Sequence, residues 1–79
     1  MNYRLLYFAS LAEAVGRPEE IIRSEVTTAK ELYQELVQRY GFSWQYDQLR
    51  VAVNGCLSTW NQVLGENDEI AFLPPVSGG

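Results

Sequence analysis

The chain has 79 residues, of which 47% are hydrophobic and 20% are charged, and its formal net charge is −4. This length leaves room for one small domain, and the composition excludes a disordered chain or a membrane protein and predicts a soluble globular one. The six lysines and arginines are scattered along the chain, so no basic stripe could follow a phosphate backbone, and direct binding of nucleic acid is not expected.

Side chains suited to metal or thiolate chemistry are scarce. The sequence has no histidine, which removes the commonest metal ligand and the commonest general base near neutral pH, so no metal site is expected. The single cysteine, Cys56, has no partner for an internal disulfide. We interpret it as a small packing residue rather than as a persulfide carrier.

Two elements are predicted near the N-terminus. Residues 3–8 are aromatic and branched without a clean polar face, which predicts a central strand buried on both sides. The stretch Ser10-Leu11-Ala12-Glu13 fits a capping box, and Gly16 fits the end of the short helix that would follow.

The same segment superficially resembles a signal peptide. Arg4 precedes an apolar run over residues 5–12, and residues 12–14 read Ala-Glu-Ala. The run is short and is broken by Ser10, and cleavage would delete the first strand of an already minimal fold. We therefore expect an uncleaved cytoplasmic protein.

The middle of the chain predicts a second strand and the main helix. Residues 22–26 alternate between apolar or small side chains and charged ones, as in a strand at or near a sheet edge. Thr28-Ala29-Lys30-Glu31 is a second capping box, and Gly41 supplies a stop. Residues 42–48 are predicted to be a connecting loop. Apolar residues recur at helical spacing between the two signals: Ala29, Leu32, Tyr33, Leu36, Val37 and Tyr40.

Three strands are predicted in the C-terminal part. Residues 49–53 alternate, Asn54-Gly55 is typical of a two-residue hairpin turn, and residues 56–59 form the returning strand. A turn at residues 65–68 leads into a last strand over residues 69–73. The predicted fold class is α+β, with one sheet packed on the main helix and a short additional helix.

The last residues, Pro74-Pro75-Val76-Ser77-Gly78-Gly79, predict a projecting tail after a domain of residues 1–73. Paired prolines favour a stiff, extended path, and glycine without a Cβ can pass through a narrow channel. A carboxylate is a poor electrophile, so adenylation of Gly79 with ATP is the natural first step. A sulfur donor would then displace AMP and leave a thiocarboxylate.

Several of these motifs resemble the molybdopterin synthase small-subunit family. They are Tyr7-Phe8-Ala9, Val51-Ala52-Val53-Asn54-Gly55 and residues 68–79, so the resemblance spans essentially the whole chain. It implies a ubiquitin-like β-grasp fold and a non-catalytic sulfur carrier without a tightly bound cofactor. It also implies that Gly79 is activated by an adenylating enzyme using ATP and receives sulfur from a sulfurtransferase.

The resemblance further implies how the sulfur is used. The tail, Pro74 to Gly79, would insert into the large subunit, which holds the active site, in an assembly of two small and two large subunits. There the sulfur would pass to cyclic pyranopterin monophosphate, and two carrier turnovers would build the dithiolene of the molybdenum cofactor. We expect the body to dock through apolar surface that includes Leu73 and Pro75.

One departure from the family pattern concerns a turn. Asn67 stands where the family usually has glycine, and we predict that it adopts a positive φ. Cys56 and Trp60 lie in the variable hairpin segment of the family, and no function is carried over to them.

Three alternatives remain at this point. The chain could carry sulfur for thiamine synthesis or for tRNA thiolation, or it could be a ubiquitin-like modifier joined through Gly79 to lysines of other proteins. It could also be an interaction module that uses exposed aromatics such as Trp44 or Trp60.

Overall fold

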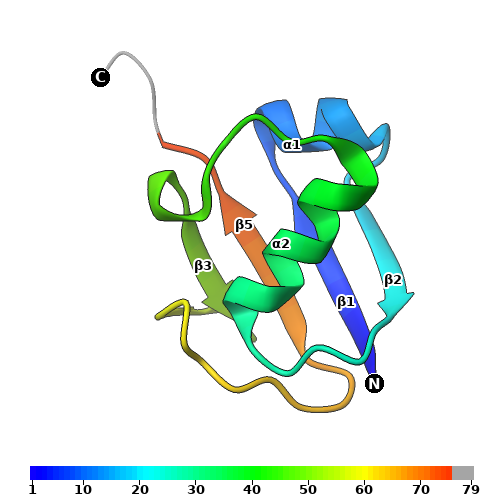
Figure 1. Cartoon of the computed structure of the whole chain (residues 1–79), viewed down its shortest axis with the longest axis vertical. Coiled ribbons are helices and arrows are strands. Elements are labelled where there is room, and N and C mark those ends of the chain that lie inside the picture. The colour runs from blue at the N-terminus through cyan, green and yellow to red at the C-terminus, as the bar shows by residue number, and fades with distance from the viewer. Residues whose placement is uncertain (76–79) are drawn as a thin grey trace.

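The structure, a computed structural model, describes residues 1–75 and is shown in Figure 1. Its elements are β1 (Asn2–Tyr7), α1 (Ala9–Val15), β2 (Glu19–Arg23), α2 (Ala29–Tyr40), the 3₁₀-helix η1 (Tyr46–Gln48), β3 (Arg50–Val53), β4 (Cys56–Ser58) and β5 (Glu69–Leu73). The predicted order of strands and helices is confirmed, and η1 interrupts the segment that was predicted to be only a loop. The strands form one mixed sheet in the order β2-β1-β5-β3-β4, in which only β1 and β5 are parallel.

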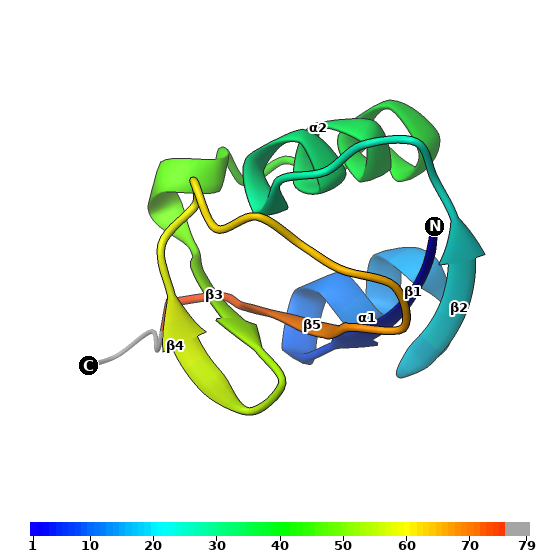
Figure 2. The ribbon, with the colours of Figure 1, turned by 90° about the horizontal axis from the view of Figure 1, so that it is seen from below.

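Helix α2 covers one face of this sheet, as Figure 2 shows. Alternate residues of the three inner strands are buried on that face, because successive side chains of a strand point to opposite sides. On the other side, here called the open face, Arg4 is exposed and Leu6 is half-buried. The prediction that residues 3–8 are buried on both sides is therefore wrong, although β1 does lie inside the sheet. The buried residues of these inner strands are Tyr3, Leu5, Tyr7, Val51, Val53, Ile70 and Phe72.

Helix α1 begins two residues earlier than the predicted capping box implies, because that box would make Ser10 the N-cap, so the capping-box prediction is wrong. Its N-cap is Phe8, which makes no side-chain capping bond. Ser10 instead accepts a hydrogen bond from Trp44 Nε1 at 3.1 Å, which joins the helix to the segment after α2. The chain turns from β1 into α1 at Ala9, where φ is 51°, and Gly16 ends the helix at φ 89° as predicted.

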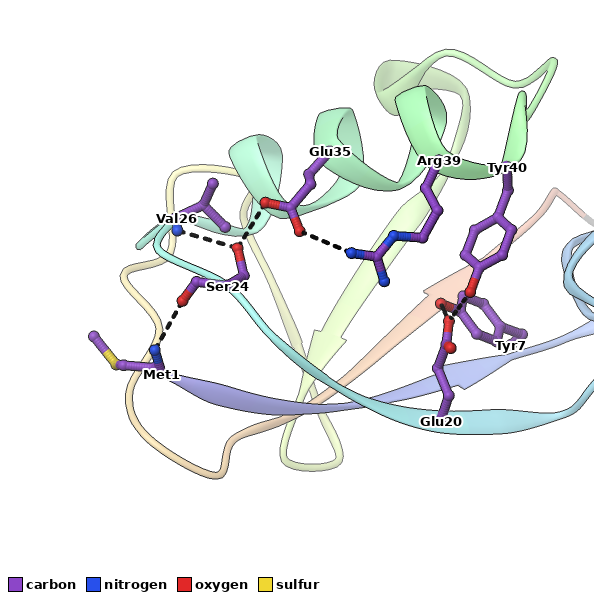
Figure 3. Close-up of polar contacts among 8 residues, drawn as sticks. All are labelled: Met1, Tyr7, Glu20, Ser24, Val26, Glu35, Arg39 and Tyr40. Atoms are coloured by element: carbon purple, nitrogen blue, oxygen red, sulfur yellow. Dashed lines mark hydrogen bonds and ion pairs between the residues drawn. The ribbon is translucent and has the colours of Figure 1, made fainter.

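Strand β2 is the edge strand that was predicted, but it spans Glu19–Arg23 rather than residues 22–26. Its last residue is followed by Ser24, which is buried and hydrogen-bonded on several sides (Figure 3). The hydroxyl of Ser24 donates to Glu35 Oε1 at 2.8 Å and accepts from the Val26 N–H, while its carbonyl accepts from the Met1 amine at 2.8 Å. Alternation in the sequence could not reveal these contacts, because they come from three separate segments.

Helix α2 has the predicted bounds. The Thr28 hydroxyl accepts from the Glu31 N–H at 3.3 Å, and Gly41 ends the helix at φ 71°. In return, Glu31 Oε1 accepts from the Thr27 N–H at 3.4 Å and from the Thr28 hydroxyl at 3.1 Å, rather than from the Thr28 N–H of a regular capping box. Two further N–H groups of the first turn donate to carbonyls of the segment between β4 and β5, which closes over this end of the helix.

The hairpin turn between β3 and β4 and the turn before β5 confirm two predictions. Asn54 and Gly55 have φ values of 51° and 84°, as a two-residue hairpin of the predicted type requires. Asn67 has a φ of 65°, so it occupies the left-handed region in which glycine is the usual residue. The Asn54 side chain also ties the hairpin to the start of β5, since it donates to Asp68 Oδ1 at 3.0 Å and accepts from Glu69 N–H at 2.9 Å.

We expect the variant Asn67→Gly to be nearly neutral or slightly stabilising. Glycine adopts the observed φ without a Cβ clash, but it also gains freedom in the unfolded chain, so the two effects largely cancel and the change in unfolding free energy stays within about 1 kcal/mol. Urea denaturation of both proteins measures it. A larger loss of stability would show that the asparagine side chain itself holds the turn.

The core is rich in aromatic residues, and the burial of individual side chains changes two interpretations made from the sequence. Trp60 stacks on Phe72 with ring centroids 6.0 Å apart, and both Trp60 and Trp44 are partly buried against the core. The two tryptophans named for the interaction-module alternative are therefore not exposed, whereas another aromatic residue, Phe8, is exposed. Cys56 is exposed on the edge strand β4, so its interpretation as a packing residue is wrong.

The buried Tyr33 predicts a loss of stability in alkali. Its hydroxyl donates to the Trp44 carbonyl at 2.6 Å, and burial raises the pKa of Tyr33 from 10.0 to about 12. The folded chain therefore keeps this proton when the unfolded chain has lost it. The stabilisation is complete below pH 10 and is lost as the pH rises toward 12, by on the order of 2 kcal/mol.

Urea unfolding between pH 8 and pH 11 tests this expectation, with Tyr33→Phe as the control. The phenylalanine variant lacks the titrating group. Its unfolding free energy should therefore decrease less steeply with pH than that of the wild type, and the difference in slope should approach the value for one bound proton. Equal slopes in the two proteins would exclude Tyr33 as a source of the effect.

Candidate functional site: the root of the tail and the open face

The structure places the root of the predicted tail at the end of the central strand. Strand β5 ends at Leu73, which is half-buried, as is Pro74, whereas Pro75 is exposed. The remaining predicted site residues, Val76, Ser77, Gly78 and Gly79, lie outside the described residues, as does most of the predicted tail of residues 74–79. The site can therefore be built from the strand that leads into the tail and from the surface around its end.

Strand β5 is held on both edges and on one face. It pairs with β1 and β3, and in this register Phe72 lies opposite Tyr7 while Leu73 lies opposite Arg50. Phe72 is fully buried, with the rings of Tyr33 and Trp60 at centroid distances of 5.4 and 6.0 Å. Since the residue just before Leu73 is fixed in the core, the chain leaves the body from a defined point.

Apolar side chains gather on the open face next to this point. Phe8, which follows β1, is 46% exposed, and Leu57 of β4 is 64% exposed. A row of partly buried apolar side chains joins them across the sheet. Leu6 lies opposite Ala71, Ala71 lies opposite Ala52, and Ala52 lies opposite Leu57. The apolar patch thus consists of Leu6, Phe8, Ala52, Leu57, Ala71 and Leu73.

Only Leu73 of this patch was predicted as a docking residue from the sequence. Leu57 could have been found from the hairpin register, which places it on the open face with Ala52. Phe8 could not, because its exposure depends on the turn at Ala9, where an alanine takes a φ of 51°. Left-handed alanine is uncommon and costs about 1 kcal/mol, so the fold maintains this turn against local strain.

Ion pairs on the open face lie away from the tail root. Arg4 contacts Glu19 at 3.2 Å and Glu69 at 4.0 Å, and its side chain is about half exposed. Pairs of this kind contribute at most about 1 kcal/mol each in water. They help to hold β2, β1 and β5 in register, and they leave the apolar patch as the main feature beside Leu73.

A cluster of acidic and phenolic groups lies instead on the helix side of the sheet (Figure 3). The hydroxyls of Tyr7 and Tyr40 both donate to Glu20 Oε2 at 2.6 Å. Burial raises the pKa of Tyr7 well above its usual range, and the hydrogen bond to Glu20 raises it further. This cluster ties β2 to α2 and lies on the opposite side of the sheet from the apolar patch, so we assign it a structural role.

In the part of the chain that the structure describes, no helix is both long and apolar enough to cross a membrane.

Comparison with known proteins agrees with this architecture over the whole chain. The model of the ThiS family matches residues 5–79. The molybdopterin synthase sulfur carrier subunit of Escherichia coli K12 is 32% identical over 79 residues, covering 96% of this chain and 98% of that protein.

Two solved structures extend the comparison. Small archaeal modifier protein 1 of Haloferax volcanii superposes with a TM-score of 0.79 at 25% identity, over 95% of this chain and 98% of that one. A chain in the complex of subunits 1 and 2 of the molybdopterin-converting factor of Helicobacter pylori matches with a TM-score of 0.69 at 26% identity, over the full length of both chains. The predicted ubiquitin-like β-grasp fold is confirmed, and the chain belongs to the ThiS family and, within it, to the small, sulfur-carrying subunits of molybdopterin synthase.

Proposed function

We propose that this chain carries sulfur for molybdopterin synthase as a thiocarboxylate on Gly79. The observation that carries the proposal is the continuous match to the sulfur carrier family through Gly79, together with a central strand that ends at two prolines. The chain itself supplies the thiocarboxylate nucleophile at the end of its tail and a docking surface that positions the tail. The large subunit supplies the active site for the pterin.

Loading begins with the Gly79 carboxylate. One of its oxygens attacks the α-phosphate of ATP in the adenylating enzyme, and pyrophosphate leaves. A hydrosulfide equivalent from the sulfurtransferase then attacks the acyl carbon, and AMP leaves with the oxygen. The product is an anionic thiocarboxylate, so no side chain of the carrier needs to transfer a proton, which agrees with the lack of histidine.

Delivery requires the tail to enter the large subunit while the body docks. Paired prolines limit the conformations of the chain at the root, which lowers the entropy lost when the tail is bound. The apolar patch beside the root exposes apolar surface, and the burial of this surface favours docking. Aromatic anchors such as Phe8 are the usual centres of such interfaces. We propose that sulfur passes to cyclic pyranopterin monophosphate, with two loaded carriers consumed for each dithiolene formed.

A reconstituted transfer reaction tests this function. Carrier with a thiocarboxylate at Gly79 is mixed with the large subunit and cyclic pyranopterin monophosphate, and molybdopterin is measured along with the carrier's intact mass. We expect product and the return of the thiocarboxylate to carboxylate at two carriers per product. Carrier that keeps its sulfur in the presence of both partners would refute the assignment.

A second candidate function is conjugation of Gly79 to lysines of other proteins. The likeness to small archaeal modifier protein 1 favours it, because that protein is named as a modifier and has the same fold. Peptide mapping of total protein from cells with and without this chain separates the two functions. Lysines of other proteins that carry the C-terminal peptide of this chain in amide linkage through Gly79 support a modifier, whereas their absence together with a loaded Gly79 supports a carrier alone.

A further inference from the structure

Arg50 occupies an unusual position at the tail root. It is the first residue of β3 and lies directly opposite Leu73, the last residue of β5. Their neighbours Val51 and Phe72 are buried under α2, so Arg50 and Leu73 both belong to the open face. Arg50 is exposed there, next to the apolar patch. Its partner across the strands, Leu73, directly precedes the first proline, Pro74.

The guanidinium of Arg50 has no ionic partner within residues 1–75. The ion pairs among these residues use Arg4 and Arg39, with carboxylates of Glu19, Glu69 and Glu35. Arg50 therefore contributes no ion pair to this part of the fold. Its charge is available at the one place from which the tail must leave for a partner.

Docking of the apolar patch would remove water from Arg50. A charge buried without a counter-ion is costly. A guanidinium that forms two parallel hydrogen bonds with a carboxylate offsets most of this desolvation cost, and the pair fixes the orientation of the two proteins. We propose that Arg50 is the charged anchor of the docking surface and that the large subunit presents a carboxylate to it. The proposal rests on the proposed function, and it adds an acidic residue to the partner surface that covers Leu73.

Substitutions of Arg50 measured against the large subunit from the same organism test the proposal. In calorimetric titrations at low salt, we expect Arg50→Glu to weaken binding by at least about 30-fold and Arg50→Gln by about tenfold. Arg50→Lys should fall between wild type and Arg50→Gln, because an ammonium keeps the charge but lacks the planar fork. The affinity of the wild-type chain should also decrease with salt more steeply than that of Arg50→Gln.

Arg23 provides a matched control on the same face. It is exposed at the far end of the edge strand β2, opposite Asn2, and it too lacks an ion pair within residues 1–75. Arg23→Glu makes the same change in net charge, and we expect less than about a threefold effect on binding. Thermal melts of each variant show whether the fold is retained, and Arg50→Gln avoids the repulsion that could disturb the charge-reversed protein.

Equal effects of Arg50→Glu and Arg23→Glu would overturn the proposal, because they would reflect net charge alone. Unchanged binding of Arg50→Gln and Arg50→Glu would overturn it as well. In both cases wild-type binding and thiocarboxylate transfer would persist, so the proposed function would stand. A wild-type chain that neither binds the large subunit nor transfers sulfur would refute both.

Discussion

Appending one alanine after Gly79 should abolish thiocarboxylate formation and leave the thermal stability unchanged. The extension moves the reactive carboxylate along the channel of the adenylating enzyme and places a side chain beside it, whereas a glycine terminus is open to in-line attack. Residues 1–75, which contain every described element, are not altered. The measurement is incubation with the adenylating enzyme, ATP and a sulfur donor, followed by intact mass.

Gly78→Ala is the matched comparison for the extension. It adds one methyl group to the path without moving the carboxylate, so the rate of loading should lie between those of the wild-type and extended chains. Thermal melts of all three proteins should coincide. An extended chain that loads sulfur at the normal rate, or one that fails only because it has unfolded, would contradict the mechanism.

The second large effect is expected from separating the tail from its body. A synthetic peptide of residues 74–79 should bind the large subunit at least about 100-fold more weakly than the intact chain, because it lacks the apolar patch and must be ordered on binding. Calorimetry with both ligands measures this difference. A peptide that binds as tightly as the whole chain would show that the body makes no docking surface.

Single substitutions locate that surface on the intact chain. Phe8→Glu and Leu57→Glu each place a charge in the apolar patch and should weaken binding by at least about tenfold. Ile21→Glu is the control, since Ile21 is 73% exposed on the open face of the edge strand β2, outside the patch. We expect it to change binding by less than about threefold, as substitutions at the rim usually do.

The sequence predicted the elements whose signals are local. The bounds of α2 follow from Thr28 and Gly41, and the hairpin follows from Asn54-Gly55, since each of these residues satisfies a backbone requirement of its own turn. The positive φ of Asn67 was predicted for the same reason. The end of β5 follows from Pro74, which has no N–H to donate to a neighbouring strand.

Features that depend on distant contacts were missed or misplaced. The position of β2 depends on its pairing with β1, and Ser24, which follows it, is held by Met1 and Glu35 from two other segments. Likewise, the mostly apolar run of residues 3–8, which has no clean polar face, does not reveal that only one side of the sheet is covered. Within the candidate site, Leu73 and Pro75 were predicted from their place in the chain. Leu57 required the hairpin register, and Phe8 required the turn at Ala9.

The intact mass of the protein purified from its own cells tests the central claim most directly. We predict a fraction of chains in which one oxygen of the Gly79 carboxylate is replaced by sulfur, and this fraction should disappear when the adenylating enzyme is deleted. Tandem mass spectrometry should place the sulfur on the terminal residue. A terminus that is always an unmodified carboxylate, or one recovered only in amide linkage to lysines of other proteins, would contradict the assignment of this chain as a sulfur carrier.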